Sequence, residues 1–226
     1  ADYQGDKTTE DWANFATYVK RVWFSSGIHH HYSADKFQPG FSEEFFREAL
    51  ASVDASKLPI AQGQTLADLC NEVFPVIFDP NVMPKRVNQA DGQDLVLTSA
   101  SFYYDGVTQT EAETFYNNLK DPKDETPIMY GMNSRLVKEN GKIVEKIWHT
   151  EGLYGEALTK VVFWLAKALS VAENNQQKTV IEKLIKYYRS GCLEDFDDYC
   201  IAWVQDLDSR IDFVNGFTES YGDPLG

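Results

Sequence analysis

The sequence is short of cysteine, with three among its 226 residues, at Cys70, Cys192 and Cys200. An odd count without a Cys-x-x-Cys pair supports neither a disulfide framework nor a zinc ribbon. Cys192 and Cys200 are eight residues apart on a predicted helix, so their thiols would lie about two turns apart, too far to bond. We therefore expect all three thiols to be free.

Positive charge is also scarce. Lys and Arg number 21 against 35 Asp and Glu, which gives a net charge of −14. Nucleic acids and anionic membranes are held mainly by Lys and Arg that meet phosphate, so this balance argues against both as partners. No apolar run approaches the roughly 20 residues of a membrane span. The first residues do not form a signal peptide, so they do not indicate the cellular compartment.

Complete catalytic motifs of the common kinds are missing. The sequence has no His-Glu-x-x-His, no Gly-x-Ser-x-Gly, no P-loop and no dinucleotide-binding fingerprint. Its clustered carboxylates are Glu194, Asp195, Asp197 and Asp198. We expect them on the solvated side of a helix, near an N-terminus whose dipole favours negative charge. The residues alone therefore assign no catalytic residue and no metal ligand.

Three adjacent histidines, His29, His30 and His31, invite a metal interpretation. Adjacent residues of a loop point in different directions, whereas metal sites use His at i and i+4 of a helix or His from separate elements. We expect hydrogen-bonding or structural histidines here, with a metal site as the alternative. The segment is dense in donors and acceptors, so it could line a cleft.

Hydrophobic periodicity predicts an α+β fold, mostly helical, with a small mixed or antiparallel sheet. Helices are expected after Thr8 or Thr9, after Ser42, over 66–74 before Pro75, and after Thr108. A further helical run extends from about 154 to 206. Asn140-Gly141 predicts a hairpin within 128–149. Strands are also expected at 95–104 and 210–213, the latter followed by a positive-φ turn at Asn215-Gly216.

Two segments resemble a known peptidase family. Residues 27–37 read Gly-Ile-His-His-His-Tyr-Ser-Ala-Asp-Lys-Phe, and Gly216 to Gly226 meets the pattern Gly-Phe-x-Glu-x-Tyr-x-Asp-Pro-x-Gly. Both are similar to the Bacteroidetes-type dipeptidyl peptidase III family, as are the helices between 154 and 206. The resemblance covers essentially the whole chain but only a part of the family's length.

This resemblance implies a zinc exopeptidase that removes dipeptides from the N-termini of short peptides. The family has two lobes around a wide cleft. Its zinc is held by a His-Glu-x-x-Gly-His helix and a downstream Glu, and the motif Glu acts as the base. None of these residues occurs in this sequence. The expectation is that residues 1–226 form a single substrate-side lobe, and that zinc belongs to a longer soluble bacterial parent of the cytoplasm or periplasm.

The same resemblance implies a substrate-binding role for Asp212. In eukaryotic members a Glu and a Tyr before the Gly-Phe pair hold the amino end of the peptide. Asp212 matches the Glu, Val214 falls where the Tyr would be, and Asn215 is the candidate substitute. Implied partners are short peptides, the zinc lobe, and a second copy bound through the exposed lobe interface. The alternative is a stand-alone, non-catalytic peptide-binding module.

Overall fold

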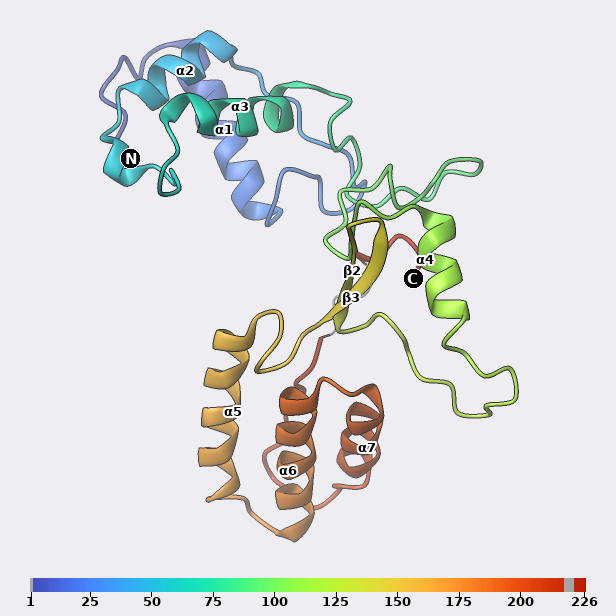
Figure 1. Cartoon of the computed structure of the whole chain (residues 1–226). Coiled ribbons are helices and arrows are strands. Elements are labelled where there is room, and N and C mark those ends of the chain that lie inside the picture. Colours follow the sequence, from blue (N-terminus) through green and yellow to red (C-terminus); the bar gives the residue numbers. More distant parts are fainter. Residues whose placement is uncertain (1, 218–221) are drawn as a thin grey trace. The chain divides into compact units, whose positions relative to one another are not determined.

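The computed structural model describes residues 2–217 and 222–226. The chain divides into two compact units, Ala1–Ser101 and Phe102–Gly226, which Figure 1 shows in sequence colours. Each unit is described by itself. Within the described ranges, no helix has the length and apolar character needed to cross a membrane.

Helices of the first unit begin where the sequence supplies caps. Helix α1 (Glu10–Phe24) follows Thr9, whose side chain accepts from the Trp12 amide. Helix α2 (Glu43–Ala51) follows Ser42, and a 3₁₀ turn, η1 (Ala55–Lys57), comes next. Helix α3 (Leu66–Phe78) opens with a capping box between Thr65 and Asp68. These side-chain oxygens satisfy amides that have no partner inside the helix, which fixes the helix starts.

An aromatic core holds these helices together. Tyr18, Phe41 and Phe45 are buried, and Phe78 packs partly buried against them. The predicted end of α3 at Pro75 is wrong, because the helix continues to Phe78. Proline removes one helical hydrogen bond. The Phe78 ring lies 5.6 Å from the Phe41 ring, and this tertiary packing retains the last turn.

The predicted strand at 95–104 is also largely wrong. Only Tyr104 joins a strand, and residues 95–98 form turns. Asp94 accounts for the difference: its carboxylate accepts from the Leu97 amide, and its carbonyl accepts from the Thr98 amide and hydroxyl. Such local bonds compete with a strand ladder for the same backbone groups.

The second unit contains a small mixed sheet. Its strands are β1 (Tyr104–Asp105), β2 (Ser134–Glu139) and β3 (Lys142–Ile147), in the order β1-β2-β3. Strand β1 pairs parallel to β2, and β2 pairs antiparallel to β3. Asn140 and Gly141 turn the hairpin with φ values of 52° and 78°. The predicted hairpin and the mixed sheet are confirmed. Helix α4 (Gln109–Asn117) lies between β1 and β2 in the sequence.

Three helices follow: α5 (Gly155–Leu169), α6 (Asn175–Ser190) and α7 (Leu193–Val204). Helix α6 packs against both others and lies between them, as Figure 1 shows. Its inner face supplies the most completely buried side chains of this core, Val180, Leu184 and Tyr187. The α+β class with a helical majority is confirmed.

One carboxylate of the predicted solvated cluster is buried. Asp195 on α7 is 8% exposed, whereas Glu194, Asp197 and Asp198 are exposed as expected. Burial raises the pKa of Asp195, but Lys186 at 2.6 Å and the Ser190 hydroxyl at 2.6 Å outweigh this and leave the pKa lowered. Asp195 therefore ties α7 to the end of α6. The three cysteines are free.

Candidate functional site

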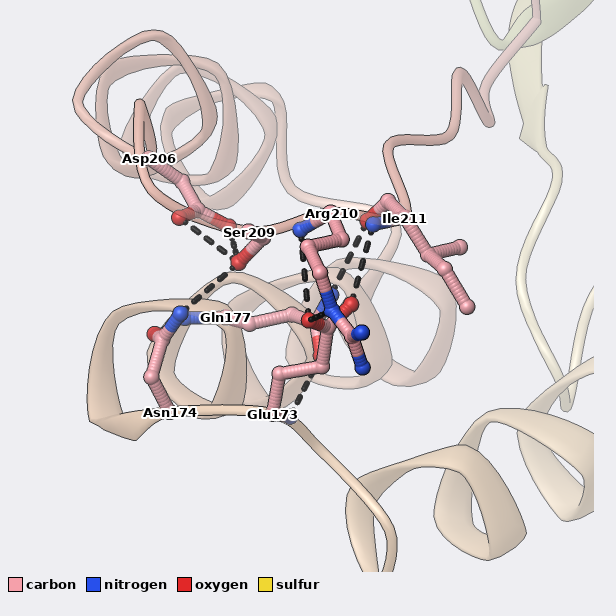
Figure 2. Close-up of polar contacts among 7 residues, drawn as sticks. All are labelled: Glu173, Asn174, Gln177, Asp206, Ser209, Arg210 and Ile211. Atoms are coloured by element: carbon pink, nitrogen blue, oxygen red, sulfur yellow. Dashed lines mark hydrogen bonds and ion pairs between the residues drawn. The ribbon is translucent and has the colours of Figure 1, made fainter.

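The segment after α7 is held by Glu173, which lies just before α6. Its carboxylate accepts from the Arg210 amide at 3.2 Å, the Ile211 amide at 2.9 Å and the Arg210 Nε at 3.2 Å. The Ile211 and Arg210 amides are the largest causes that lower the pKa of Glu173. Figure 2 shows these contacts. The predicted strand at 210–213 is therefore wrong, since a carboxylate occupies amides that a strand partner would need.

Further polar contacts complete this anchor, as Figure 2 also shows. Asn174 caps α6 and donates from Nδ2 to the Ser209 hydroxyl at 2.9 Å, which in turn donates to Asp206. The buried Gln177 donates to the Ile211 carbonyl at 3.0 Å and accepts from the Glu173 amide at 2.8 Å. The start of α6 thus fixes the backbone that leads to residues 212–215.

That backbone borders an apolar cleft of about 510 Å³. We call it the α5–α6 cleft, and its lining residues are Lys160, Val161, Trp164, Leu165, Ala168, Ile181, Phe213 and Asn215. Trp164 is 68% exposed. Binding sites for small ligands are typically apolar concavities with a few placed polar groups. Asn215 and Lys160 are the polar members here.

Asn215 is oriented by a buried tyrosine. The Tyr188 hydroxyl donates to its Oδ1. Burial raises the pKa of Tyr188 to about 12, so the hydroxyl keeps its proton and acts as the donor. Because Oδ1 accepts this bond, the Nδ2 group is left with two N–H donors. Neither Asn215 nor Gly216 has a positive φ, so the predicted positive-φ turn is wrong.

Asp212 lies on the same segment but outside the cleft lining. Its Oδ1 accepts from Trp203 Nε1 at 2.8 Å and from the Phe213 amide at 2.8 Å. The side chain is exposed, and within the described residues its Oδ2 has no hydrogen-bond partner. Phe213 and Asn215 face the cleft, whereas Asp212 and Val214 are exposed. The structure therefore brings one of the two predicted site residues to the cleft.

Comparison with known proteins decides the family. The model of Peptidase family M49 matches residues 80–226, which is most of the chain.

The chain belongs to peptidase family M49.

Individual relatives agree with this assignment. The chain is 24% identical over 242 residues to dipeptidyl peptidase 3 of Dictyostelium discoideum, which covers 96% of this chain and 32% of that protein. It is 24% identical to dipeptidyl peptidase 3 of Nematostella vectensis over 97% of the chain and 33% of the relative. It is 22% identical to dipeptidyl peptidase 3 of Homo sapiens, over 97% of this chain and 32% of the relative. The chain spans about a third of the length of the curated relatives it matches.

No metal site is formed by the described part of this M49 chain. Within residues 2–217 and 222–226, no group of three or more His, Cys, Asp or Glu is placed to hold an ion. His29 is buried, and its Nε2 bonds the Met83 carbonyl at 2.8 Å. His30 Nδ1 accepts from the Tyr32 and Ser33 amides at 3.2 Å. The prediction of hydrogen-bonding histidines is confirmed for these two.

The M49 match includes the family string at the end of the chain. Its Gly216, Phe217 and the 222–226 portion are described, whereas Glu219 and Tyr221 lie outside the described residues. Phe217 packs on Trp148, with ring centroids 4.7 Å apart. Asp223 accepts from the Tyr104 hydroxyl at 2.8 and 2.9 Å, which ties the string to β1.

Sequence reasoning missed Glu173 and Gln177, which position the site. Asn174 is a favourable N-cap, which could have indicated the start of α6 but not the contacts of Glu173 or Gln177. The partners of Glu173 lie 37 and 38 residues further along the chain. No local pattern connects such distant groups.

Proposed function

We propose that this chain is the substrate-side part of a zinc-dependent dipeptidyl peptidase that removes dipeptides from the N-termini of short peptides. Both compact units would belong to that substrate-side lobe. The chain supplies scaffold and a peptide-binding cleft, and the zinc ligands lie in the remaining part of the parent. The relatives named above are dipeptidyl peptidases, which supports the reaction class.

The observation that carries the proposal is the anchored segment 211–215 beside the α5–α6 cleft. Asn215 offers two N–H donors to a peptide carbonyl, since Tyr188 occupies its Oδ1. Trp164 and Phe213 offer apolar surface to a side chain. The exposed Asp212 carboxylate offers its Oδ2 to the ammonium of the peptide, which would be a charge-assisted contact.

Zinc would supply a polarised water for hydrolysis in the complete enzyme. The described residues of this chain do not fit the ion, because they bring no ligand group together. No step of bond cleavage is therefore assigned to them. Their part is to bind and orient the amino end of the peptide.

A hydrolysis assay tests this division of labour. The 226-residue chain is incubated with a dipeptidyl-2-naphthylamide, with and without added zinc. We expect no release of naphthylamine in either case. Release that a chelator abolishes would contradict the placement of the zinc ligands outside this chain.

The parent gene gives an independent test. Its reading frame should continue beyond Gly226 into a His-Glu-x-x-Gly-His motif. A stop codon directly after Gly226 would contradict the enzyme proposal. Peptide binding without hydrolysis by a protein that ends there would instead support a stand-alone binding module.

A further inference from the structure

The first unit contains a second cavity, of about 750 Å³, that the proposed function does not use. It lies between the last turns of α1 and the loop that carries the three histidines. We call it the basic cavity, and the lining residues used below are Lys20, Arg21, Phe24, His30, His31 and Tyr32. Its volume falls within the range of about 300–1,000 Å³ typical of small-molecule sites.

The cations of this cavity have no acidic partner within the described residues. Among residues 2–217 and 222–226, no ion pair involves Lys20 or Arg21, although the chain carries a net charge of −14. The acid in the lining, Asp35, is paired with Lys85 at 2.6 Å. A third cation, Lys36, donates hydrogen bonds from its ammonium to the carbonyls of Asp79 and Val82. Two exposed cations therefore remain available to a ligand.

His30 adds a directed donor. Its Nδ1 accepts from the Tyr32 and Ser33 amides, so this nitrogen carries no proton. The ring proton must then sit on Nε2, which is left to donate. The Phe37 ring meets the His30 ring edge-on at 6.1 Å and helps to hold its orientation. The turn thus leaves Nε2 as the ring nitrogen that can donate to a ligand.

Aromatic surface accompanies these donors. Phe24 is 91% exposed and Tyr32 is 89% exposed, and both line the cavity. The His31 ring packs edge-on against Tyr32 at 5.0 Å, which supports that ring. Exposed rings beside free cations suit a ligand that is flat and apolar at one end and anionic at the other.

We propose that the basic cavity binds a small organic anion, whose anionic group meets Lys20, Arg21 and His30 and whose flat apolar group lies on Phe24 and Tyr32. This site shares no lining residue with the α5–α6 cleft, and the proposal does not depend on the peptidase function. The dipole of α1 favours a cation such as Arg21 in its last turn, even without a ligand. This dipole effect does not explain the exposed rings or the directed His30 donor.

Calorimetric titration of the 226-residue chain with 1-naphthyl phosphate tests the site. Inorganic phosphate and 1-naphthol are titrated in parallel. We expect 1-naphthyl phosphate to bind at least about tenfold more tightly than either single-feature probe. Equal affinity for 1-naphthol would show apolar contact alone and would overturn the proposal. Equal affinity for phosphate would show general anion attraction and would overturn it too.

Substitutions locate the binding. Lys20→Gln with Arg21→Gln should raise the Kd for 1-naphthyl phosphate at least about tenfold, because two charge-assisted contacts are lost. The matched control is Lys178→Gln with Arg189→Gln on α6, exposed positions with the same change in charge. The control should leave the Kd unchanged. An unchanged Kd in the first pair, or an equal loss in the control, would overturn the proposal.

A third variant tests the His30 donor. His30→Asp keeps an oxygen that can accept from the Tyr32 and Ser33 amides but replaces the donor with a negative charge. Binding should be lost, while the circular dichroism melting curve stays that of the wild type. A variant with wild-type melting and wild-type Kd would overturn the role of His30.

Discussion

The Tyr188 hydroxyl donates a hydrogen bond to Asn215 Oδ1, so a buried side chain of α6 orients the amide that lines the α5–α6 cleft. This contact joins the helical core to the candidate site. Glu173 holds the same segment from its other end, through the Arg210 and Ile211 amides. The site segment is therefore fixed at both ends by residues of α6 or of the turn before it.

Tyr188→Phe should weaken peptide binding without unfolding the chain. Loss of the hydrogen bond costs about 1 kcal/mol of stability and releases the Asn215 amide. We expect the Kd for a short peptide to rise about three- to tenfold, measured by calorimetry. The same substitution in an Asn215→Ala background should cause no further loss of affinity. Equal losses in both backgrounds would show that Tyr188 does not act through Asn215.

Glu173→Gln should make the chain less stable at neutral pH. The folded-state pKa of Glu173 is lowered from its ordinary value of 4.5, so its contribution is present above about pH 4.5 and is lost as the pH falls through the folded value. Thermal melting should show a lower Tm for the variant at pH 7. The two Tm values should converge as the pH falls below the folded-state pKa of Glu173.

The control for this experiment is Glu156→Gln. Glu156 pairs with Lys160 on the exposed side of α5, where its side chain is 88% exposed. Exposed pairs of this kind contribute little to stability. The melting curve of this control should follow that of the wild type at pH 7 and throughout the acid range. A Tm difference for Glu173→Gln that does not shrink as the pH is lowered would contradict the electrostatic account.

Substitution of two adjacent aromatic residues on α5 distinguishes binding in the cleft from general surface effects. Trp164 lines the cleft, whereas its neighbour Phe163 does not, and the two are 68% and 53% exposed. Trp164→Ala should raise the peptide Kd about tenfold, since large aromatic anchors dominate binding energies. Phe163→Ala should leave it unchanged. Calorimetric titration measures both, and equal effects would show that the cleft is not the binding site.

Sequence motifs predicted those helix starts and turns that depend on contacts between residues close in the chain. Thr65 with Asp68 starts α3, and Asn140-Gly141 turns the hairpin, because each motif satisfies backbone groups within a few residues. The strand predicted at 210–213 failed for the opposite reason. Its amides bond Glu173, a partner 37 residues away, and alternation of apolar residues carries no information about such a contact.

The candidate site was predictable only in part. A family resemblance, and no local pattern, indicated Asp212 and Asn215. The cleft is assembled from α5, α6 and the 213–215 segment, so its existence depends on tertiary packing. Asp195 shows the same limit, because its burial follows from contacts with Lys186 and Ser190 on another helix.

Binding of a tetrapeptide with a free amino terminus, compared with its N-acetylated form, tests the central claim most directly. Calorimetry on the 226-residue chain should give at least about tenfold tighter binding of the free-amino peptide, because Asp212 offers a carboxylate to the ammonium. Asp212→Asn should remove that preference. Equal binding of both peptides by the wild-type chain would contradict the claim that this chain holds the amino end of the substrate.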